Sequence, residues 1–486
     1  MPSNEKRLND MVLAGLPRQV TRPGYDRSAL QTGIVHLGIG AFHRAHQAVM
    51  TEAVIAAGDY RWGIVGASLR SPTTRDALAA QDWLYSVATR GASTESVQVV
   101  GALRGVLVAP ESPSTLIGVL ADPRVKIVSL TVTEKGYCHS PATGDLAVDN
   151  ADIQHDLGNA GAPRTTLGLL TAALARRRQN GHAAPTLLSC DNLLANGHTL
   201  KRLLVQFAGL SDPVLARYIE DNVMCPNTMV DRIVPATTEE DCQRIARVLG
   251  VMDAAAVVTE PFCQWVIEDF FPSGRPEWER AGAEMVDDVA PYEIMKLRLL
   301  NAAHSAIAYL GALAGFETVA EAMRDDGIAR FVTGLMDEEV TPVLNLPDTF
   351  DIATYKRALI ARFSNPALKH RTHQIAMDGS QKLPPRVLAT VRERLKLNLP
   401  IKRLAIVVAA WMHYLAGRDE RDRRHEVRDP MQAELQRRCA EAADLLDIEA
   451  IFGRDLPADT RFSGAVETAL LTLRERGVSA TVEPLK

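Results

Sequence analysis

One stretch of the chain carries an amine, an imidazole, an amide and a carboxylate at the spacing of a helix face. Residues 291–311 begin with proline, have an early glutamate and continue with Leu, Ile and Ala at helical intervals, which predicts one helix. With Lys296 at zero and about 100° per residue, Glu293 falls at about 60° and His304 at about 80°. Asn301 falls at about 140° by the same count. Four groups that can carry protons or hydrogen bonds therefore share one side of a largely apolar helix.

A lysine on such a face has the chemistry of a general base. Burial disfavours the charged ammonium, so a buried lysine titrates nearer to neutrality than an exposed one. A pKa near the working pH is the property that a general acid or base needs. The spacing equally allows a core helix with a few satisfied polar groups, because Leu297, Leu300 and Ile307 lie in the same arc.

Composition narrows the class of protein. The chain has 486 residues, is 47% hydrophobic and 23% charged, and has a net charge of -5 with acids and bases interspersed. These values predict a globular protein of two or three domains with no nucleic-acid partner. Six scattered cysteines favour a reducing compartment over a disulfide framework.

Neither a secretory signal nor a membrane span is expected. The first residues have no apolar core after their charges. The longest charge-free run, residues 299–316, is close to the length of a membrane span but is interrupted by Asn301, His304 and two glycines. We interpret it as buried in protein, and we expect a cytoplasmic location.

A glycine turn follows the first predicted strand. Residues 33–38 form a short apolar run that ends in Gly38-Ile-Gly40-Ala-Phe-His43-Arg44. A strand, a glycine turn and a helix start are typical of a dinucleotide-binding unit, because glycines let backbone N–H groups approach a pyrophosphate. The third glycine position holds His43, so an ordinary strand-to-helix turn remains an alternative.

The second predicted strand, residues 62–67, leaves the choice of nicotinamide open. An NAD site usually has Asp or Glu at the end of this strand for the ribose hydroxyls. Here Ser68 and Arg70 follow, and the first acid is Asp76. Arg70 could accept a 2′-phosphate or lie on a solvated turn.

Two further strands are predicted at residues 125–132 and 186–190, with an amphipathic helix at 166–177 between them. Alternating strands and helices indicate an α/β domain with a largely parallel sheet. Polar residues follow both strands: Thr133-Glu-Lys-Gly-Tyr137 and Asp191-Asn192. Parallel sheets bind ligands at this end of their strands, although Asp191 also suits a turn or a helix cap.

From about residue 290 the pattern is helical, as at 404–415 and 431–446. We therefore predict an α/β dinucleotide-binding domain over residues 1–287 and a mostly α-helical substrate and catalytic domain over residues 288–486. Residues 1 to about 32 are polar and irregular and are predicted to form a surface arm.

Taken together, the motifs resemble the polyol-specific long-chain dehydrogenase/reductase (mannitol dehydrogenase) family over nearly the whole chain. The matching segments are Gly38-Ile-Gly-Ala-Phe-His-Arg-Ala-His-Gln47, residues 129–138, Ser189-Cys-Asp-Asn192, Met229-Val-Asp-Arg232, Glu260-Pro-Phe and Lys296-x4-Asn301-x2-His304. The resemblance implies a Rossmann-like first domain. It also implies metal-independent hydride transfer between a nicotinamide and a secondary alcohol or ketone.

The resemblance assigns roles residue by residue. Lys296 would be the base in oxidation and the proton donor in reduction. Asn192 and Asn301 would hydrogen-bond the oxygen that gains negative charge, as in an oxyanion site. The remaining implied roles are substrate orientation by His304 and Asp231, proton relay by Glu293 and Glu134, and cofactor binding by Gly38, Gly40, Phe42, His43 and Arg44. NAD is the expected cofactor, with NADP not excluded.

Two rival interpretations are a zinc site and a nucleotide sensor. Zinc ligands drawn from His43, His46, Cys190 and Cys225 fit no tight ligand spacing, so no metal is expected. A nucleotide sensor without turnover would keep the glycine turn but lose the lysine, asparagine and histidine of the helix. All of these are present.

Two departures from the mannitol dehydrogenase pattern bear on the substrate. Lys135 stands where those enzymes have glycine, and Gln374 stands where they have an arginine eight residues before Lys382. Residues 370–384 look more like the fructuronate reductases of the family. A uronate carboxylate needs cationic partners, for which Lys135 and Arg371 are candidates, although both could equally face solvent. Lys382 is expected to bind the substrate. We expect interconversion of D-fructuronate and D-mannonate, with mannitol, arabinitol or another polyol as the alternative. The oligomeric state is left open.

Overall fold

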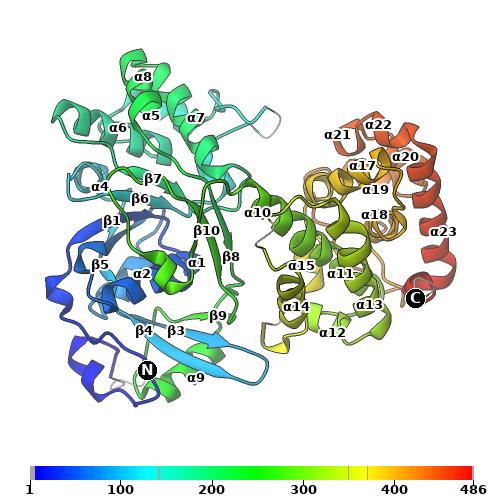
Figure 1. Cartoon of the computed structure of the whole chain (residues 1–486), viewed down its shortest axis with the longest axis horizontal. Coiled ribbons are helices and arrows are strands. Elements are labelled where there is room, and N and C mark those ends of the chain that lie inside the picture. The colour runs from blue at the N-terminus through cyan, green and yellow to red at the C-terminus, as the bar shows by residue number, and fades with distance from the viewer. Residues whose placement is uncertain (1–5, 141–142, 348–349, 369, 484–486) are drawn as a thin grey trace. The chain divides into compact units, whose positions relative to one another are not determined.

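The computed structural model describes residues 6–140, 143–347, 350–368 and 370–483 (Figure 1). The chain divides into two compact units, Met1–Ala290 and Pro291–Lys486, called unit 1 and unit 2 below. The boundary expected from the sequence lies between residues 287 and 288.

Unit 1 is built on a five-stranded sheet in the order β5–β2–β1–β6–β7. All four neighbouring pairs are parallel. Two three-stranded sheets, β11–β10–β8 and β4–β3–β9, complete the unit. The strands are β1 Thr32–Leu37, β2 Gly63–Ser68, β3 Tyr85–Arg90, β4 Glu95–Val100, β5 Leu103–Val108, β6 Ile127–Leu130, β7 Thr186–Ser189, β8 Thr228–Asp231, β9 Val257–Thr259, β10 Gln264–Glu268 and β11 Glu284–Val286.

Both faces of the five-stranded sheet are buried. Alternate residues of a strand point to opposite faces, so Val35 and Leu37 of β1 join one core while Ile34 joins another. The first core contains helices α4, α6, α7 and α8, and the second contains α2 and Trp265. The helices of unit 1 are α1 Ala41–Ala45, α2 Gln47–Ala56, α3 Thr73–Ala79, α4 Pro113–Leu120, α5 Ala151–Gly158, α6 Thr166–Gln179, α7 Asn196–Gly209, α8 Pro213–Asn222 and α9 Glu239–Leu249.

The predicted fold class is confirmed. The four predicted strands correspond to β1, β2, β6 and β7, and the predicted helix at 166–177 corresponds to α6. The strands that the sequence did not reveal include β9 and β11, which have three residues each. Three residues are too few to show a period of two.

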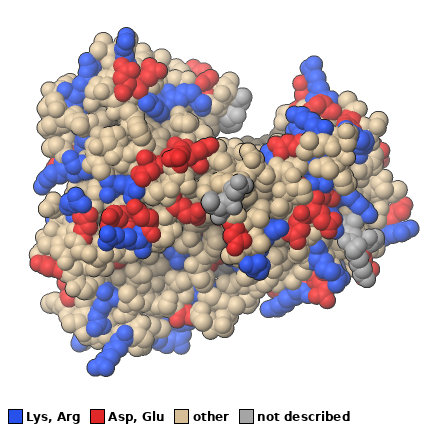
Figure 2. Space-filling model, viewed as in Figure 1, with Lys and Arg blue, Asp and Glu red and all other residues tan. Residues whose placement is uncertain are grey.

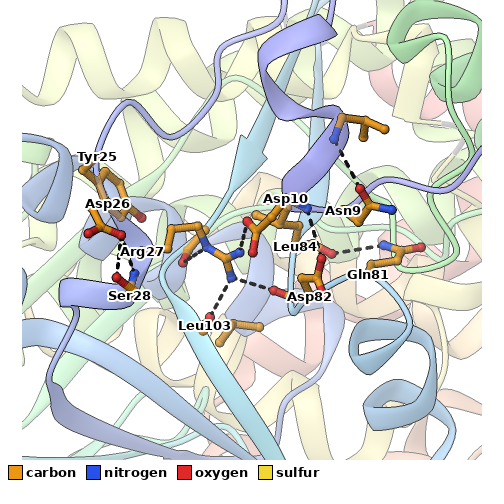
Figure 3. A network of polar contacts seen from close by, with 12 residues as sticks. Asn9, Asp10, Tyr25, Asp26, Arg27, Ser28, Gln81, Asp82, Leu84 and Leu103 are labelled. Carbon is orange, nitrogen blue, oxygen red and sulfur yellow. Dashed lines mark hydrogen bonds and ion pairs between the residues drawn. The ribbon is translucent and has the colours of Figure 1, made fainter.

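The N-terminal segment differs from the prediction of a surface arm. Leu8, Leu16 and Val20 are buried in a cluster with helix α9. In Figure 3 the Arg27 guanidinium donates to the carbonyl oxygens of Asp82 and Leu103, at 2.7 and 3.2 Å. The segment is therefore part of the fold of unit 1. Its apolar residues are single and widely spaced, so they give no periodic signal in the sequence.

In the described ranges of unit 2, every named element is a helix. Its centre is α11, every residue of which is buried, and α18 packs against it. The helices are α10 Ala290–Met295, α11 Ala302–Leu313, α12 Val319–Ala322, α13 Asp326–Gly334, α14 Ile352–Phe363, α15 Thr372–Ile375, α16 Gly379–Leu383, α17 Ala389–Lys396, α18 Lys402–Tyr414, α19 Gln432–Arg438, α20 Ala442–Leu446, α21 Glu449–Phe452, α22 Asp455–Ala458 and α23 Thr460–Val482. Three π-helical segments lie between or beside them: η6 Lys296–Asn301, η7 Leu335–Val340 and η10 Pro384–Leu388.

Two predicted helices of unit 2 are interrupted. Residues 291–311 are helical, but the π segment η6 separates α10 from α11. The predicted helix at 431–446 breaks between α19 and α20. Periodicity locates helical segments well but does not report a change in hydrogen-bond register.

Among the described residues, none of the helices combines the length and the apolarity that a membrane crossing requires. On the face drawn in Figure 2, basic and acidic side chains are interspersed over the surface.

Candidate active site

The glycine turn of unit 1 requires glycine at its first position. Gly38 has a φ of +96°, and a Cβ at this residue would lie 2.1 Å from the carbonyl oxygen of Thr131. Its N–H donates to the Ala67 carbonyl at 2.9 Å. Gly38 thus lets the chain leave β1 tightly against the ends of β2 and β6.

Gly40 has a different environment. It precedes α1 in extended backbone geometry with a φ of -76°. The nearest atom that a Cβ would meet is the Gly38 carbonyl oxygen at 3.9 Å. The backbone at Gly40 is therefore accessible to a bulky anion, and the first N–H groups of α1 follow directly. These features fit the pyrophosphate of a dinucleotide.

The side chains after Gly40 turn inward. His43 is buried and stacks on His36, with ring centroids 3.4 Å apart. The Arg44 guanidinium donates to the Ala255 carbonyl and lies over the Tyr85 ring. Phe42, which is partly exposed, stacks on His46 at 5.0 Å. The side chains of His43 and Arg44 are thus used for packing, so this segment offers a cofactor mainly its main-chain N–H groups.

His36 supports the turn and was not singled out from the sequence. Its ring nitrogens lie 2.8 Å from Ser129 Oγ and 2.8 Å from Thr131 Oγ1. Thr131 Oγ1 also donates to the Gly38 carbonyl at 2.8 Å. Burial lowers the pKa of His36 to about 3, so the ring is neutral. A single histidine inside a strand carries no sequence signal for this role.

The segments after β6 and β7 are joined through Asp191. Its carboxylate accepts the N–H groups of Val132 and Thr133, at 3.0 and 2.8 Å, and the Tyr137 hydroxyl at 2.8 Å. Burial raises the pKa of Asp191. This residue therefore has a structural role, as the turn interpretation of the sequence expected, and it fixes the backbone immediately before Asn192.

Asn192 is exposed and follows that anchor directly. Glu134 and Lys135 are also exposed, on the short helix η4, Glu134–Tyr137. Because β1, β6 and β7 are parallel neighbours, the glycine turn, these two residues and Asn192 all lie at the carboxyl end of one sheet.

Asp231 ends strand β8 and is 5% exposed. It stands opposite Gln264 in the antiparallel pairing with β10. The next residue, Arg232, donates to the Glu260 carbonyl through Nη2 at 2.9 Å. The sequence motif around Asp231 is therefore held rigidly by its neighbours.

In unit 2, Lys296 and Asn301 are the first and last residues of the π segment η6. Glu293 lies in α10 before it, and His304 lies in α11 after it. Lys296 and Glu293 are each 9% exposed and both have polar contacts. The structure therefore places all four predicted groups in one continuous helical stretch.

His304 is a neutral imidazole. It is buried against Phe363, with centroids 4.6 Å apart, and meets the edge of His370 at 5.4 Å. Burial, followed by the nearby His370, Arg362 and Arg386, lowers the pKa of His304 well below its usual value. It can donate or accept a hydrogen bond but does not carry charge near neutral pH.

Lys382 belongs to the same neighbourhood. Its Nζ donates to the Ile375 carbonyl at 3.3 Å. Burial and the Lys382 charge together lower the pKa of His370. Lys382, Arg362 and Arg386 thus make the surroundings of His304 and His370 electropositive.

Arg371 lies elsewhere in unit 2. It is exposed, caps the start of α15 and lines a pocket of about 340 Å³ at the far end of α11, with Gly315, Phe316 and Arg423. Among the described residues that line this pocket, neither His304 nor Lys382 is found. Arg371 therefore lines a different pocket from the surroundings of His304 and Lys382.

The residues weighed as zinc ligands have other surroundings. Within the described ranges, no three His, Cys, Asp or Glu side chains gather in a way that could hold a metal ion. His46 Nε2 lies 3.0 Å from the Gln264 carbonyl. Cys190 and Cys225 are buried thiols, and burial raises the pKa of Cys225 to about 12.

The similarity of this chain to known proteins extends over nearly its whole length. The mannitol dehydrogenase Rossmann domain matches residues 32–280, and the mannitol dehydrogenase C-terminal domain matches residues 288–474. The D-mannonate oxidoreductase of Escherichia coli is 46% identical, over 98% of this chain and 100% of its own. A mannitol 2-dehydrogenase of Aspergillus terreus is 42% identical, over 99% and 98%. The solved ternary complex of Pseudomonas fluorescens mannitol 2-dehydrogenase with NAD and D-mannitol is 40% identical, with a TM-score of 0.87 and 99% of both chains covered.

Proposed function

The chain belongs to the mannitol dehydrogenase family and is an NAD-dependent oxidoreductase of secondary alcohols, and from this premise we propose that it interconverts D-fructuronate and D-mannonate. The observation that carries the choice of substrate is the electropositive surroundings of His304. Lys382, Arg362 and Arg386 are cations, and a sugar acid has a carboxylate that a polyol lacks. The likeness to a D-mannonate oxidoreductase points the same way.

The proposed chemistry uses Lys296 as the acid and base. In reduction, the Lys296 ammonium donates a proton to the ketone oxygen, and in oxidation the neutral amine removes the proton of the hydroxyl. NAD, when bound, accepts or supplies the hydride. The ketone carbon and oxygen thus gain one hydride and one proton, which balances the reaction without a metal.

Neighbouring side chains are proposed to stabilise the reacting oxygen and to orient the sugar. Asn301 and Asn192 are hydrogen-bond donors to the oxygen that gains negative charge. Neutral His304 orients the same oxygen, and Asp231 accepts a hydrogen bond from a neighbouring hydroxyl. Glu293 and Glu134 are proposed to relay protons.

Cofactor binding is proposed for the glycine turn of unit 1. Gly38 shapes the turn, Gly40 leaves the backbone accessible, and Phe42 and His43 contribute main-chain N–H groups, whereas the Arg44 N–H donates to the Gly40 carbonyl at 3.2 Å. Arg70 is exposed after β2. If it binds the 2′-phosphate of NADP, the enzyme will prefer NADPH to NADH. The measurement is the ratio of catalytic efficiencies with NADH and NADPH, and a preference of more than about tenfold for NADPH would assign Arg70 or a neighbour to the phosphate.

The second candidate is a mannitol 2-dehydrogenase or another polyol dehydrogenase. It is favoured by the 40% identical solved structure that holds NAD and D-mannitol. The two functions differ in whether the substrate carries a carboxylate.

Steady-state kinetics with fructuronate, tagaturonate, fructose and mannitol, each with both nicotinamides, test the proposal. We expect the highest kcat/KM with fructuronate and NADH. A higher kcat/KM with fructose and mannitol than with either uronate would replace the proposal by the polyol function.

A further inference from the structure

The π segment η6 changes which side chains of the catalytic stretch share a face. A turn that closes from residue i to i+5 advances by about 82° per residue, compared with about 100° in an α-helix. Counted from Lys296, Asn301 then falls at about 50° instead of about 140°. His304 follows in regular α-helix and falls at about -10° instead of about 80°.

The π segment brings these side chains into a narrower arc around the helix than a regular α-helix would. The three side chains that the proposed chemistry needs occupy about 60° of the helix circumference with the π turn and about 140° without it. Groups that act on one oxygen atom must converge on it, so the narrower arc is the productive arrangement. We call the segment Lys296–Asn301 the π turn.

A π turn is less stable than regular α-helix and persists where other contacts favour it. Arg298 lies within the π turn, and its guanidinium makes two bonds to the carboxylate of Glu393 in α17, at 2.5 and 2.8 Å. The Arg298 side chain is 11% exposed and that of Glu393 is 41% exposed. This two-bond pair, with the guanidinium buried and the carboxylate partly exposed, fixes the outer face of the turn.

A second contact acts at the end of the turn. The Asn301 carbonyl accepts the Ser305 hydroxyl at 3.0 Å and Arg386 Nη1 at 3.5 Å. Arg386 Nη1 also donates to Ser305 Oγ at 3.3 Å. These bonds give the carbonyl side-chain partners where the register of the helix changes.

Both contacts come from one neighbouring segment. Arg386 belongs to η10 and Glu393 to α17, which continues it, and η10 packs against η6. The two residues are seven apart, close to two helical turns, so they lie on one face. The segment therefore contacts the π turn at two points.

We propose that Arg298, Glu393 and Arg386 are positioning residues that hold the π turn and thereby align Lys296, Asn301 and His304 for reaction. The proposal rests on the function proposed above, because it assigns the aligned side chains to catalysis. None of the three positioning residues needs to touch the substrate for this role.

The structure offers a matched control. A second π segment, η7, carries Glu338, which pairs with Arg403 at 2.5 Å. Arg403 is 9% exposed, close to the value for Arg298, and Glu338 is more exposed than Glu393, at 62%. Glu393→Gln removes an Arg–Glu ion pair that the π turn makes through its arginine, and Glu338→Gln removes one that η7 makes through its glutamate. Only the π turn contains Lys296.

The experiment compares kcat, KM, melting temperature and the primary isotope effect with 4-deuterated NADH. We expect Glu393→Gln and Arg298→Met to lower kcat by about 10- to 100-fold with KM changed less than about threefold. The isotope effect should rise, because misalignment slows the chemical step. Glu338→Gln should leave kcat and the isotope effect at wild-type values.

Rescue separates alignment from general damage. Arg298→Lys should recover much of the loss seen in Arg298→Met. The exchanged pair Arg298→Glu with Glu393→Arg should exceed the kcat of either single variant. Equal kcat losses in Glu393→Gln and Glu338→Gln, or a wild-type kcat in both Arg298→Met and Glu393→Gln, would overturn the proposal.

Lys296→Ala distinguishes a failure of the positioning role from a failure of the proposed function. An inactive Lys296→Ala beside fully active Arg298→Met and Glu393→Gln variants would reject the positioning role alone. An active Lys296→Ala would reject the assigned chemistry itself, and the positioning role with it.

Discussion

Unit 1 and unit 2 position their candidate residues in opposite ways. In unit 1 the candidate residues come from segments that follow β1, β6 and β7 and from the last residue of β8, and the proposed cofactor contacts include main-chain N–H groups and glycine geometry. In unit 2 the candidates are side chains of one helical stretch. Unit 1 therefore depends on sheet topology, whereas unit 2 depends on the angular positions of side chains around a helix.

The buried histidines show the same contrast. The pKa of His36 is lowered by burial alone, while a backbone bond to Gly38 acts in the other direction. The pKa of His304 is lowered by burial and further by His370, Arg362 and Arg386. In unit 1 burial thus keeps the ring neutral against a hydrogen bond that favours the charged form, whereas in unit 2 nearby cations and a second imidazole add to the effect of burial.

The largest expected effect concerns Lys296, the proposed acid and base of unit 2. Lys296→Ala should lower kcat by about 100- to 10,000-fold, because it removes a positioned acid and base. NADH binding should persist, since unit 1 is proposed to supply the cofactor contacts. Turnover and NADH fluorescence titration measure the two properties, and more than half of the wild-type activity near neutral pH would contradict the assignment.

The next test compares two glycines of unit 1. Gly38→Ala should destabilise the fold by at least about 2 kcal/mol, because of its positive φ and the close Thr131 carbonyl. Gly40→Ala should leave the melting temperature nearly unchanged but raise the Kd for NADH about tenfold or more, because a methyl group would occupy the space proposed for the pyrophosphate. An unchanged NADH affinity in a stable Gly40→Ala variant would place the cofactor elsewhere.

Substrate charge provides the third test. Loss of a charge-assisted hydrogen bond to a carboxylate costs about 1.5–3 kcal/mol, or roughly 10- to 150-fold in turnover of fructuronate relative to fructose. Lys382→Met and Lys135→Met are expected to divide this loss between them. Arg371→Met is the matched control, because Arg371 lines a different pocket.

The ratio of kcat/KM for fructuronate to that for fructose is the measurement, since a folding defect lowers both values together. If neither lysine variant changes the ratio, a polyol becomes the better substrate assignment. If Arg371→Met changes it most, the carboxylate contact belongs to the far end of α11 instead.

The last test concerns a pH dependence of stability through His36, which leaves activity near neutral pH unchanged. Its folded pKa of about 3 lies below the ordinary value of about 6.5, so between these values the unfolded chain binds more protons. Stability is therefore complete above about pH 6.5 and falls as the pH decreases toward 3, by at most about 1.4 kcal/mol per pH unit for this one ring. In urea unfolding at several pH values, His36→Asn should flatten this dependence, and an unchanged slope would contradict the role of His36.

Sequence patterns were sufficient for the fold class and for many of its elements. The glycine turn, the parallel strands β1, β2, β6 and β7, and the helical second unit all follow from local periodicity and turn chemistry, which act over a few residues. The N-terminal segment and the shortest strands did not follow from such patterns. Their burial depends on partners far along the chain, as Leu8 does on α9.

The same distinction between local patterns and distant partners applies to the candidate site. The sequence determined that Lys296, Asn301 and His304 share one helical stretch, because spacing along a helix is a local property. It did not determine that the stretch contains a π turn, nor that Arg44 points into the core and Arg371 lines a separate pocket. Tertiary structure decided these features, because the register of the turn is tied to partners such as Glu393, almost a hundred residues further on.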